Sequence, residues 1–173
     1  MKKALFLDRD GVINVELHYL YKIEKFKFIE GIFELCRYYQ TQGYLIFVVT
    51  NQSGIARGYY NESDFNILTS WMTQEFQKEA VNITKVYYCP HHPDISGECS
   101  CRKPKNGMIL KAKNEYDLDL RNSVLIGDKE SDIEAAKSAG ILSTYLFDEK
   151  KRVEKSKATK IVSKLEEIYS ANT

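Results

Sequence analysis

The amino-acid sequence predicts an α/β protein, a three-layer Rossmann-like fold built on a mostly parallel sheet. Short apolar runs of strand length alternate with segments whose apolar residues recur at helical spacing. This alternation is typical of a parallel sheet covered on both faces. The chain has 173 residues, of which 43% are hydrophobic and 28% charged, which is enough to bury one hydrophobic core. We therefore expect a single domain over residues 1–173.

Five strands are predicted, each a short run of apolar, β-branched or aromatic residues. Residues 44–50 form an unbroken run, the pattern of a strand buried on both faces. The runs 3–8 and 123–128 both end in a carboxylate, and 83–89 and 143–147 complete the set. Residues that follow parallel strands meet at one edge of the sheet, where such sheets bind ligands.

Four helices are predicted between and after these strands. Residues 31–42 place apolar side chains at i, i+3, i+4 and i+7. Asn61 is a suitable N-cap for a helix whose apolar stripe reaches Phe76. Residues 130–139 form the next helix, and 158–169 are expected to close the chain as a helix. The intervals between these elements are too short for a separate cap domain.

Charge and hydropathy exclude several classes of protein. The chain has 25 Lys and Arg against 24 Asp and Glu, a formal net charge of +1, so no strong field favours nucleic acid or a membrane surface. The longest strongly apolar run, residues 45–49, is too short to cross a bilayer. The N-terminal apolar run breaks at Asp8, too early for a signal peptide. We expect a cytoplasmic monomer with reduced thiols and a small-molecule partner.

Carboxylates cluster at the ends of two predicted strands. Asp8 and Asp10 are two positions apart, so their side chains face the same way on an extended backbone. Asp128 ends the fourth predicted strand. Carboxylates gathered at one edge repel one another unless a cation lies between them, and all-oxygen ligands favour Mg²⁺. A single Asp in such a place is commonly a turn cap, so the prediction depends on both strand ends together.

Two further positions suit the binding of a phosphoryl group. Residues 50–54, Thr-Asn-Gln-Ser-Gly, follow the second predicted strand, and a hydroxyl with loop N–H groups can hold phosphoryl oxygens. Lys103 can balance the charge of a phosphate.

The order of these features resembles the four motifs of the haloacid dehalogenase-like phosphohydrolases: an acidic pair, Thr50, Lys103, then Gly127-Asp128 with a further carboxylate, Asp132, four residues on. Longer blocks resemble, more narrowly, the D-glycero-D-manno-heptose-1,7-bisphosphate 7-phosphatase family. The histidinol-phosphate phosphatases share this pattern. The blocks are residues 6–14, 49–58, 88–93 and 99–104.

The resemblance implies a Mg²⁺-dependent phosphoric monoester hydrolase. Asp8 would be the nucleophile and Asp10 the general acid and base. Mg²⁺ would lie between the Asp8 carboxylate, the main-chain carbonyl of Asp10 and Asp128, with Thr50 and Lys103 holding phosphoryl oxygens. The implied reaction removes the 7-phosphate of D-glycero-D-manno-heptose 1,7-bisphosphate through an aspartyl-phosphate, in nucleotide-activated heptose biosynthesis for lipopolysaccharide core or surface polysaccharide. Hydrolysis of histidinol phosphate is the alternative.

Further substrate contacts are implied by position in the family pattern. Arg102 suits a second, non-reacting phosphate, because a guanidinium binds two oxygens at once. Sugar hydroxyls could be bound from the loop after the first strand, and Lys129 could add charge beside Asp128. The full set of implied substrate contacts beyond the catalytic residues is Arg9, Glu16, His18, Tyr19, Asn51, Gln52, Ser53, Arg102 and Lys129.

Three of the four cysteines cluster with two histidines between them. Cys89, Cys99 and Cys101 with one imidazole make a tetrahedral set for a closed structural zinc site, and the family pattern selects His91 over His92. A disulfide is the competing interpretation, disfavoured in the cytosol. Such a zinc-stapled loop would fix Arg102 and Lys103 without a core of its own. Cys36 lies on an apolar helix face and is expected to be a core residue.

Two interpretations from other classes stay open at this stage. In a zinc-stabilised binding module the acidic residues would only cap turns, and no phosphate would be released. A nucleic-acid end-processing phosphatase would need a basic, aromatic-rich stripe, which the sequence lacks.

Overall fold

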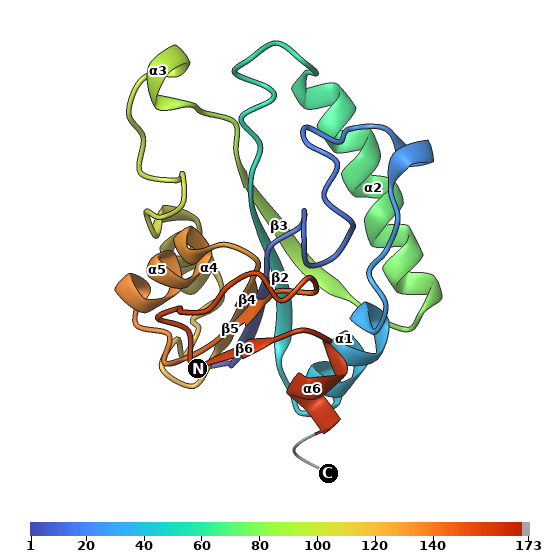
Figure 1. The fold of residues 1–173 in the computed structure, drawn as a ribbon, viewed down its shortest axis with the longest axis vertical. Helices are drawn as coiled ribbons and strands as arrows, with labels where there is room; N and C mark the ends of the chain where they lie inside the picture. Colours follow the sequence, from blue (N-terminus) through green and yellow to red (C-terminus); the bar gives the residue numbers. More distant parts are fainter. Residues whose placement is uncertain (171–173) are drawn as a thin grey trace.

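The computed structural model describes residues 1–170, and the last three residues of the expected domain, 171–173, lie outside this description. In the described part, six parallel strands form one sheet in the order β3-β2-β1-β4-β5-β6. Helices α1, α2 and α6 lie on one side of the sheet and α4 and α5 on the other (Figure 1). The strands are β1 Ala4–Leu7, β2 Leu45–Asn51, β3 Ile83–Cys89, β4 Val124–Gly127, β5 Ser143–Phe147 and β6 Lys160–Val162. The helices are η1 Ile23–Lys25, α1 Ile32–Thr41, α2 Glu62–Lys78, α3 Pro93–Ser96, α4 Gly107–Tyr116, α5 Glu130–Ala139 and α6 Glu166–Tyr169. The three-layer Rossmann-like prediction is confirmed.

The two faces of the sheet are packed by alternate side chains of the same strands. Leu5 and Leu7 of β1 join the core beneath α1, α2 and α6, whereas Phe6 joins the core beneath α4 and α5. Phe6 stacks on Phe47 of the neighbouring β2, with ring centroids 5.5 Å apart. Because both faces are covered, the central strands β1 and β4 are buried along their whole length, which is why they were recognisable in the sequence.

The long helix α2 begins after the N-cap residue Asn61, as the sequence predicts. The Asn61 side chain accepts a hydrogen bond from the Asp64 backbone N–H at 2.8 Å, and Asp64 accepts one from the Asn61 N–H at 3.0 Å. This reciprocal cap satisfies two N–H groups that have no partner within the helix. The start of α2 fixes where the chain turns back after β2.

One predicted element is wrong in its first half. Residues 158–169 are not one helix: Lys160–Val162 pairs with β5 as β6, and only Glu166–Tyr169 is helical. Ile161 and Val162 pack on opposite faces of the sheet, which is strand spacing and not helical spacing. The β-branched residues Ile161 and Val162 therefore extend the sheet at the open edge of β5. The helical spacing of apolar residues holds only for Leu165 and Ile168, further along the chain. The helices α3 and α4 were not predicted.

The loops at the carboxyl edge are short. The interval from Gly11 to Gly31 contains only the short helix η1, and the interval between β2 and β3 contains α2. Within the described residues, neither interval holds a cap domain, as predicted. None of the helices in residues 1–170 combines the length and apolar composition that a membrane span needs.

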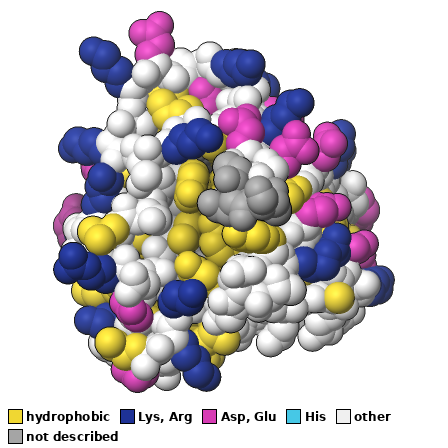
Figure 2. Space-filling model, turned by 90° about the horizontal axis from the view of Figure 1, so that it is seen from below, with side chains coloured by type: hydrophobic (Ala, Val, Ile, Leu, Met, Phe, Trp, Pro, Cys, Tyr) yellow, Lys and Arg dark blue, Asp and Glu magenta, His cyan; other side chains and the backbone are white. Residues whose placement is uncertain are grey.

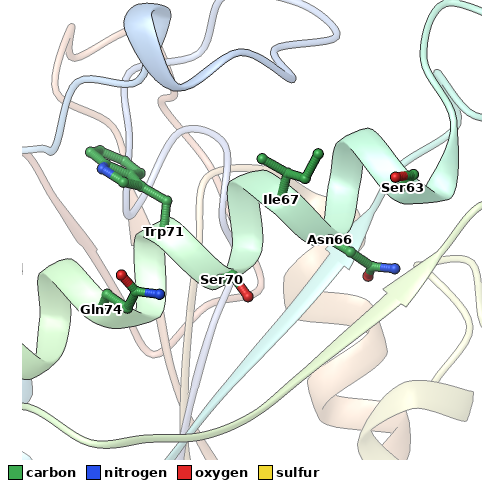
Figure 3. A pocket seen from close by; sticks show the side chains of 6 residues that line it. All are labelled: Ser63, Asn66, Ile67, Ser70, Trp71 and Gln74. Atoms are coloured by element: carbon green, nitrogen blue, oxygen red, sulfur yellow. The ribbon is translucent and has the colours of Figure 1, made fainter.

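Two surface features carry no chemistry of their own. On the face seen in Figure 2, charged side chains of both signs are scattered around a central gathering of hydrophobic side chains. A shallow hollow along α2 is lined by uncharged side chains that project from the helix (Figure 3). The residues are Ser63, Asn66, Ile67, Ser70, Trp71 and Gln74. Without a titratable group, this hollow is not a candidate for acid–base catalysis.

The packing of α2 predicts a sharp difference between its two faces. Phe76 is fully buried and meets Phe28 and Phe33 edge-on, whereas Ile67 is 59% exposed. We expect Phe76→Ala to lower the free energy of unfolding by about 3–5 kcal/mol and Ile67→Ala by less than about 0.5 kcal/mol, as measured by urea denaturation. Equal losses in the two variants would contradict the assignment of the buried face.

Candidate active site

The carboxylates predicted to meet at the sheet edge do meet. Asp8 directly follows β1 and Asp128 directly follows β4, and β1 and β4 are neighbours in the sheet. One oxygen from each of Asp8, Asp128 and Asp132 lies within 4.8 Å of the others. The three carboxylates are therefore close enough to share one ion.

Gly11 makes this approach possible. Its backbone has a φ of 92°, in the left-handed region that glycine adopts without strain. A Cβ at this position would overlap the Asp128 carboxylate. The loop that carries Asp10 can thus pass directly against the end of β4.

Lys103 supplies the positive charge inside the cluster. Its Nζ lies 2.9 Å from Asp8 Oδ1, 2.6 Å from Asp132 Oδ1 and 2.8 Å from the Val49 carbonyl oxygen. The side chain is buried, and although burial lowers the pKa of this ammonium, the carboxylates of Asp132 and Asp8 raise it above its usual value. Lys103 therefore stays charged and faces the predicted nucleophile.

One ammonium does not balance three carboxylates. Burial and then the nearby Asp132 carboxylate raise the pKa of Asp8 well above its usual value, against the opposing effect of Lys103. Burial is also the main cause that raises the pKa of Asp128 to about 6. Asp128 Oδ1 is buried and has no hydrogen-bond partner. An orphaned carboxylate oxygen in a cluster with excess negative charge fits a divalent cation with oxygen ligands, such as Mg²⁺.

Asp132 belongs to the site but was not among the predicted site residues. Its Oδ1 pairs with Lys103, and its Oδ2 accepts the backbone N–H groups of Asp128 and Lys129, each at 3.1 Å. Both oxygens are thus occupied by protein donors, so Asp132 orients Lys103 and the start of α5 and is a poor candidate for a direct metal ligand. Its spacing, four residues after Asp128, was the signal in the sequence.

The predicted acid–base residue, Asp10, is held by donors on both oxygens. Asn14 Nδ2 lies 3.0 Å from Oδ1, and Gln52 Nε2 lies 3.1 Å from Oδ2. Arg9 forms an ion pair with the same carboxylate at 3.1 Å and donates to the Leu20 carbonyl at 2.8 Å. Arg9 is 1% exposed. Its Nη2 binds Asp10 and the Leu20 carbonyl, whereas its buried Nε has no hydrogen-bond partner in the described residues.

The residues after β2 connect the two halves of the site. Thr50 is buried at the strand end, and Gln52 Nε2 donates to its hydroxyl oxygen at 2.8 Å. Asn51 clasps the backbone of Lys103: it accepts from the Lys103 N–H at 3.0 Å and donates to the Lys103 carbonyl at 3.2 Å. The side chains of Asn51 and Gln52 thus bind protein groups, and their direct contact with substrate stays a prediction.

The other predicted substrate contacts lie on loops around this centre. His18 and Tyr19 are exposed and both have positive φ, with the His18 N–H bound to Glu16 at 2.7 Å. Arg102 donates to the His91 carbonyl at 3.4 Å, which ties it to the cysteine loop. Lys129 is exposed and Ser53 half-buried. The contact of these side chains with substrate stays a prediction.

The predicted zinc ligands converge. The structure pairs Cys89 with Cys101 as a disulfide, where the sequence led us to expect reduced thiols. Cys99 Sγ lies 3.7 Å from the sulfurs of both, and His91 Nδ1 lies 3.6 Å from Cys89 Sγ and 3.4 Å from Cys101 Sγ. A tetrahedral zinc site has edges of roughly 3.5–3.8 Å, given Zn–S and Zn–N bonds of about 2.3 and 2.0 Å. Four contacts of this cluster come close to those edges, while the disulfide closes the Cys89–Cys101 edge. The cluster, which includes the predicted His91, is therefore compatible with a zinc site.

Comparison with known proteins agrees with this geometry. A family model described as HAD-hydrolase-like matches residues 100–168. A D-glycero-alpha-D-manno-heptose-1,7-bisphosphate 7-phosphatase from Campylobacter jejuni is 57% identical over 150 residues, covering 87% of this chain and 85% of its own. A D-glycero-beta-D-manno-heptose-1,7-bisphosphate 7-phosphatase from Pasteurella multocida is 47% identical, covering 84% of this chain and 82% of its own.

A solved structure extends the agreement to the whole fold. The crystal structure of a D,D-heptose 1,7-bisphosphate phosphatase from B. bronchiseptica, complexed with magnesium and phosphate, aligns with a TM-score of 0.85 at 28% identity. The alignment covers 98% of this chain and 97% of that one. The chain belongs to the D-glycero-D-manno-heptose-1,7-bisphosphate 7-phosphatase family of the HAD-like hydrolases.

Proposed function

We propose that this protein removes the 7-phosphate of D-glycero-D-manno-heptose 1,7-bisphosphate, with the α anomer as its preferred substrate. The observation that carries the proposal is the buried contact of Asp8 with Lys103, next to the orphaned oxygen of Asp128. The choice of substrate is supported by the relatives' names. The choice of anomer is supported by two α-named relatives at 57% and 52% identity, against 44–49% for five β-named relatives and 44% for a further α-named one.

The reaction proceeds in two displacements at phosphorus. The Asp8 carboxylate attacks the 7-phosphate, a P–O bond forms to Asp8, and the P–O bond to the sugar breaks. Asp10 gives its proton to the departing sugar oxygen. Asp10 then takes a proton from water as the water attacks the aspartyl-phosphate, which releases inorganic phosphate and restores the Asp8 carboxylate.

Side chains around Asp8 stabilise the charge on the transferring group. Lys103 and the Thr50 hydroxyl are the donors for the non-bridging oxygens. Asp8, the Asp10 main-chain carbonyl and Asp128 would hold Mg²⁺. When bound, the ion offsets the negative charge of carboxylates and phosphate, and this lowers the barrier to attack of one anion on another.

A second metal would be structural. We propose that Cys89, His91, Cys99 and Cys101 bind zinc in the reducing cytoplasm, in place of the Cys89–Cys101 disulfide. Four protein ligands leave no open coordination position. The loop so closed holds Arg102, which donates to the His91 carbonyl, toward the non-reacting phosphate of the substrate. In this proposal the enzyme acts as a monomer on a small molecule and on neither nucleic acid nor a membrane surface.

A substrate panel tests the proposed function. With Mg²⁺, we expect phosphate release from the α anomer of heptose 1,7-bisphosphate, with kcat/KM about tenfold lower for the β anomer and about a hundredfold lower for histidinol phosphate. Asp8→Asn should lower kcat by at least about a thousandfold, because the nucleophile is lost.

Each unexpected result of the panel has a defined meaning. Faster hydrolysis of histidinol phosphate would overturn the proposed substrate. Full turnover by Asp8→Asn would overturn the proposed nucleophile. If no compound of the panel released phosphate, the interpretation as a zinc-stabilised binding module would be favoured over an enzyme.

The zinc loop generates its own test. We expect about one zinc per wild-type chain by elemental analysis, and Cys101→Ala should lose the metal and reduce kcat/KM about 10–100-fold. Cys36→Ala is the matched control, because Cys36 is buried in the core beneath α1 and is no part of the cluster. Asp8→Asn should keep its zinc. A zinc-free Cys101→Ala protein with full turnover would refute the positioning role of the loop.

A further inference from the structure

Tyr60 is buried beside the active site and its ring is fixed on both sides. It is 6% exposed and stacks on Tyr21, with ring centroids 5.3 Å apart and planes 15° from parallel. Gly54 lies against the ring, and a Cβ at Gly54 would overlap it. Neither the sequence patterns nor the relatives' names point to this residue. Its hydroxyl is therefore held in one place, away from water.

The Tyr60 hydroxyl begins a chain of hydrogen bonds that ends at two catalytic groups. It donates to Gln52 Oε1. Gln52, which is 3% exposed, donates from Nε2 to Asp10 Oδ2 at 3.1 Å and to Thr50 Oγ1 at 2.8 Å. One amide thus joins Tyr60 to the predicted acid–base residue and to a predicted phosphoryl-binding hydroxyl.

The chain has a fixed direction. An amide oxygen only accepts hydrogen bonds and an amide nitrogen only donates them. Because the Tyr60 O–H donates to the amide oxygen, the nitrogen must face Asp10 and Thr50. Burial raises the pKa of Tyr60 to about 12, so the hydroxyl keeps the proton that it donates.

This direction determines what Thr50 can do. With one lone pair of Thr50 Oγ1 taken by Gln52, the hydroxyl hydrogen is directed elsewhere. Its recorded protein acceptor, the Asn51 carbonyl, is distant at 3.4 Å, so the hydrogen remains available for a phosphoryl oxygen. A reversed amide would instead present its oxygen to the Asp10 carboxylate, and the two acceptors would repel each other.

We propose that Tyr60 is a positioning residue for phosphoryl transfer: through Gln52 it sets the amide so that Thr50 donates to the transferring phosphoryl group and Asp10 is held beside it. The proposal rests on the proposed phosphatase function. In this proposal Gln52 orients Asp10 and Thr50 and does not contact the sugar.

Tyr60→Phe tests the proposal, because it keeps the ring and removes only the hydroxyl. In the Mg²⁺-loaded enzyme we expect kcat to fall about tenfold, the worth of one oriented hydrogen bond, with KM for heptose 1,7-bisphosphate changed less than about twofold. Inhibition by orthovanadate, which mimics five-coordinate phosphorus, should weaken by a similar factor. Tyr116→Phe is the control: its ring packs against Phe47, and no hydrogen bond of its hydroxyl is recorded within residues 1–170.

A double-mutant cycle separates positioning from a general loss of structure. If Tyr60 acts through Gln52, adding Tyr60→Phe to Gln52→Ala should change kcat less than about twofold. Two equal, independent losses, or a Tyr60→Phe enzyme with wild-type kcat and vanadate inhibition, would overturn the proposal. Wild-type activity on the same substrate shows separately whether the proposed function holds. Thermal unfolding of each variant identifies any loss that comes from misfolding.

Discussion

The structure depends on the crowding of three carboxylates, those of the buried Asp8 and Asp132 and the half-buried Asp128, around one ammonium. Asp8, Asp128 and Asp132 share a space within 4.8 Å, and Lys103 contacts two of them. Desolvation makes such a set costly unless the remaining charge is balanced. Burial raises the pKa of both Asp8 and Asp128, and the neighbouring Asp132 carboxylate raises both further, so negative charge at this place is costly. A phosphatase can use this imbalance, since it draws a divalent cation to the place where a phosphate dianion must be attacked.

The parallel sheet assembles this centre from distant parts of the chain. β1, β2 and β4 deliver Asp8, Thr50 and Asp128 to one edge. The fourth group, Lys103, lies in a loop and not at a strand end, so the sheet does not fix its position and other contacts must do so. Asn51 binds its backbone on both sides and Asp132 binds its ammonium. The cysteine cluster ends two residues before Lys103, so the loop that carries the cluster lies directly next to a residue that we propose to be catalytic.

The sequence predicted the features that have strong local signals. Five strands were readable as short apolar, β-branched or aromatic runs, and Asp8 and Asp128 were found because each directly follows a strand that is buried along its whole length. The sixth strand was missed because three residues on a sheet edge carry too short a pattern, and Ile161 also fits a helical period with Leu165. Tyr60 and Gln52 could not be found as partners, because the bond between their side chains exists only after Gly54 lets the ring turn inward. Asp132 could be noticed in the sequence because it lies four residues after Asp128. Its ion pair with Lys103 could not be predicted, because the two residues come together only in the folded chain.

The most direct test of the charge imbalance is the effect of Mg²⁺ on thermal unfolding of the protein at neutral pH. Binding to the native state alone raises the unfolding midpoint, and we expect wild type to show this rise while Asp128→Asn does not. Asp148→Asn, at the end of the neighbouring β5, removes a carboxylate that accepts the Val153 N–H and should leave the rise intact. An equal rise in Asp128→Asn, or none in wild type, would contradict a shared cation between the ends of β1 and β4.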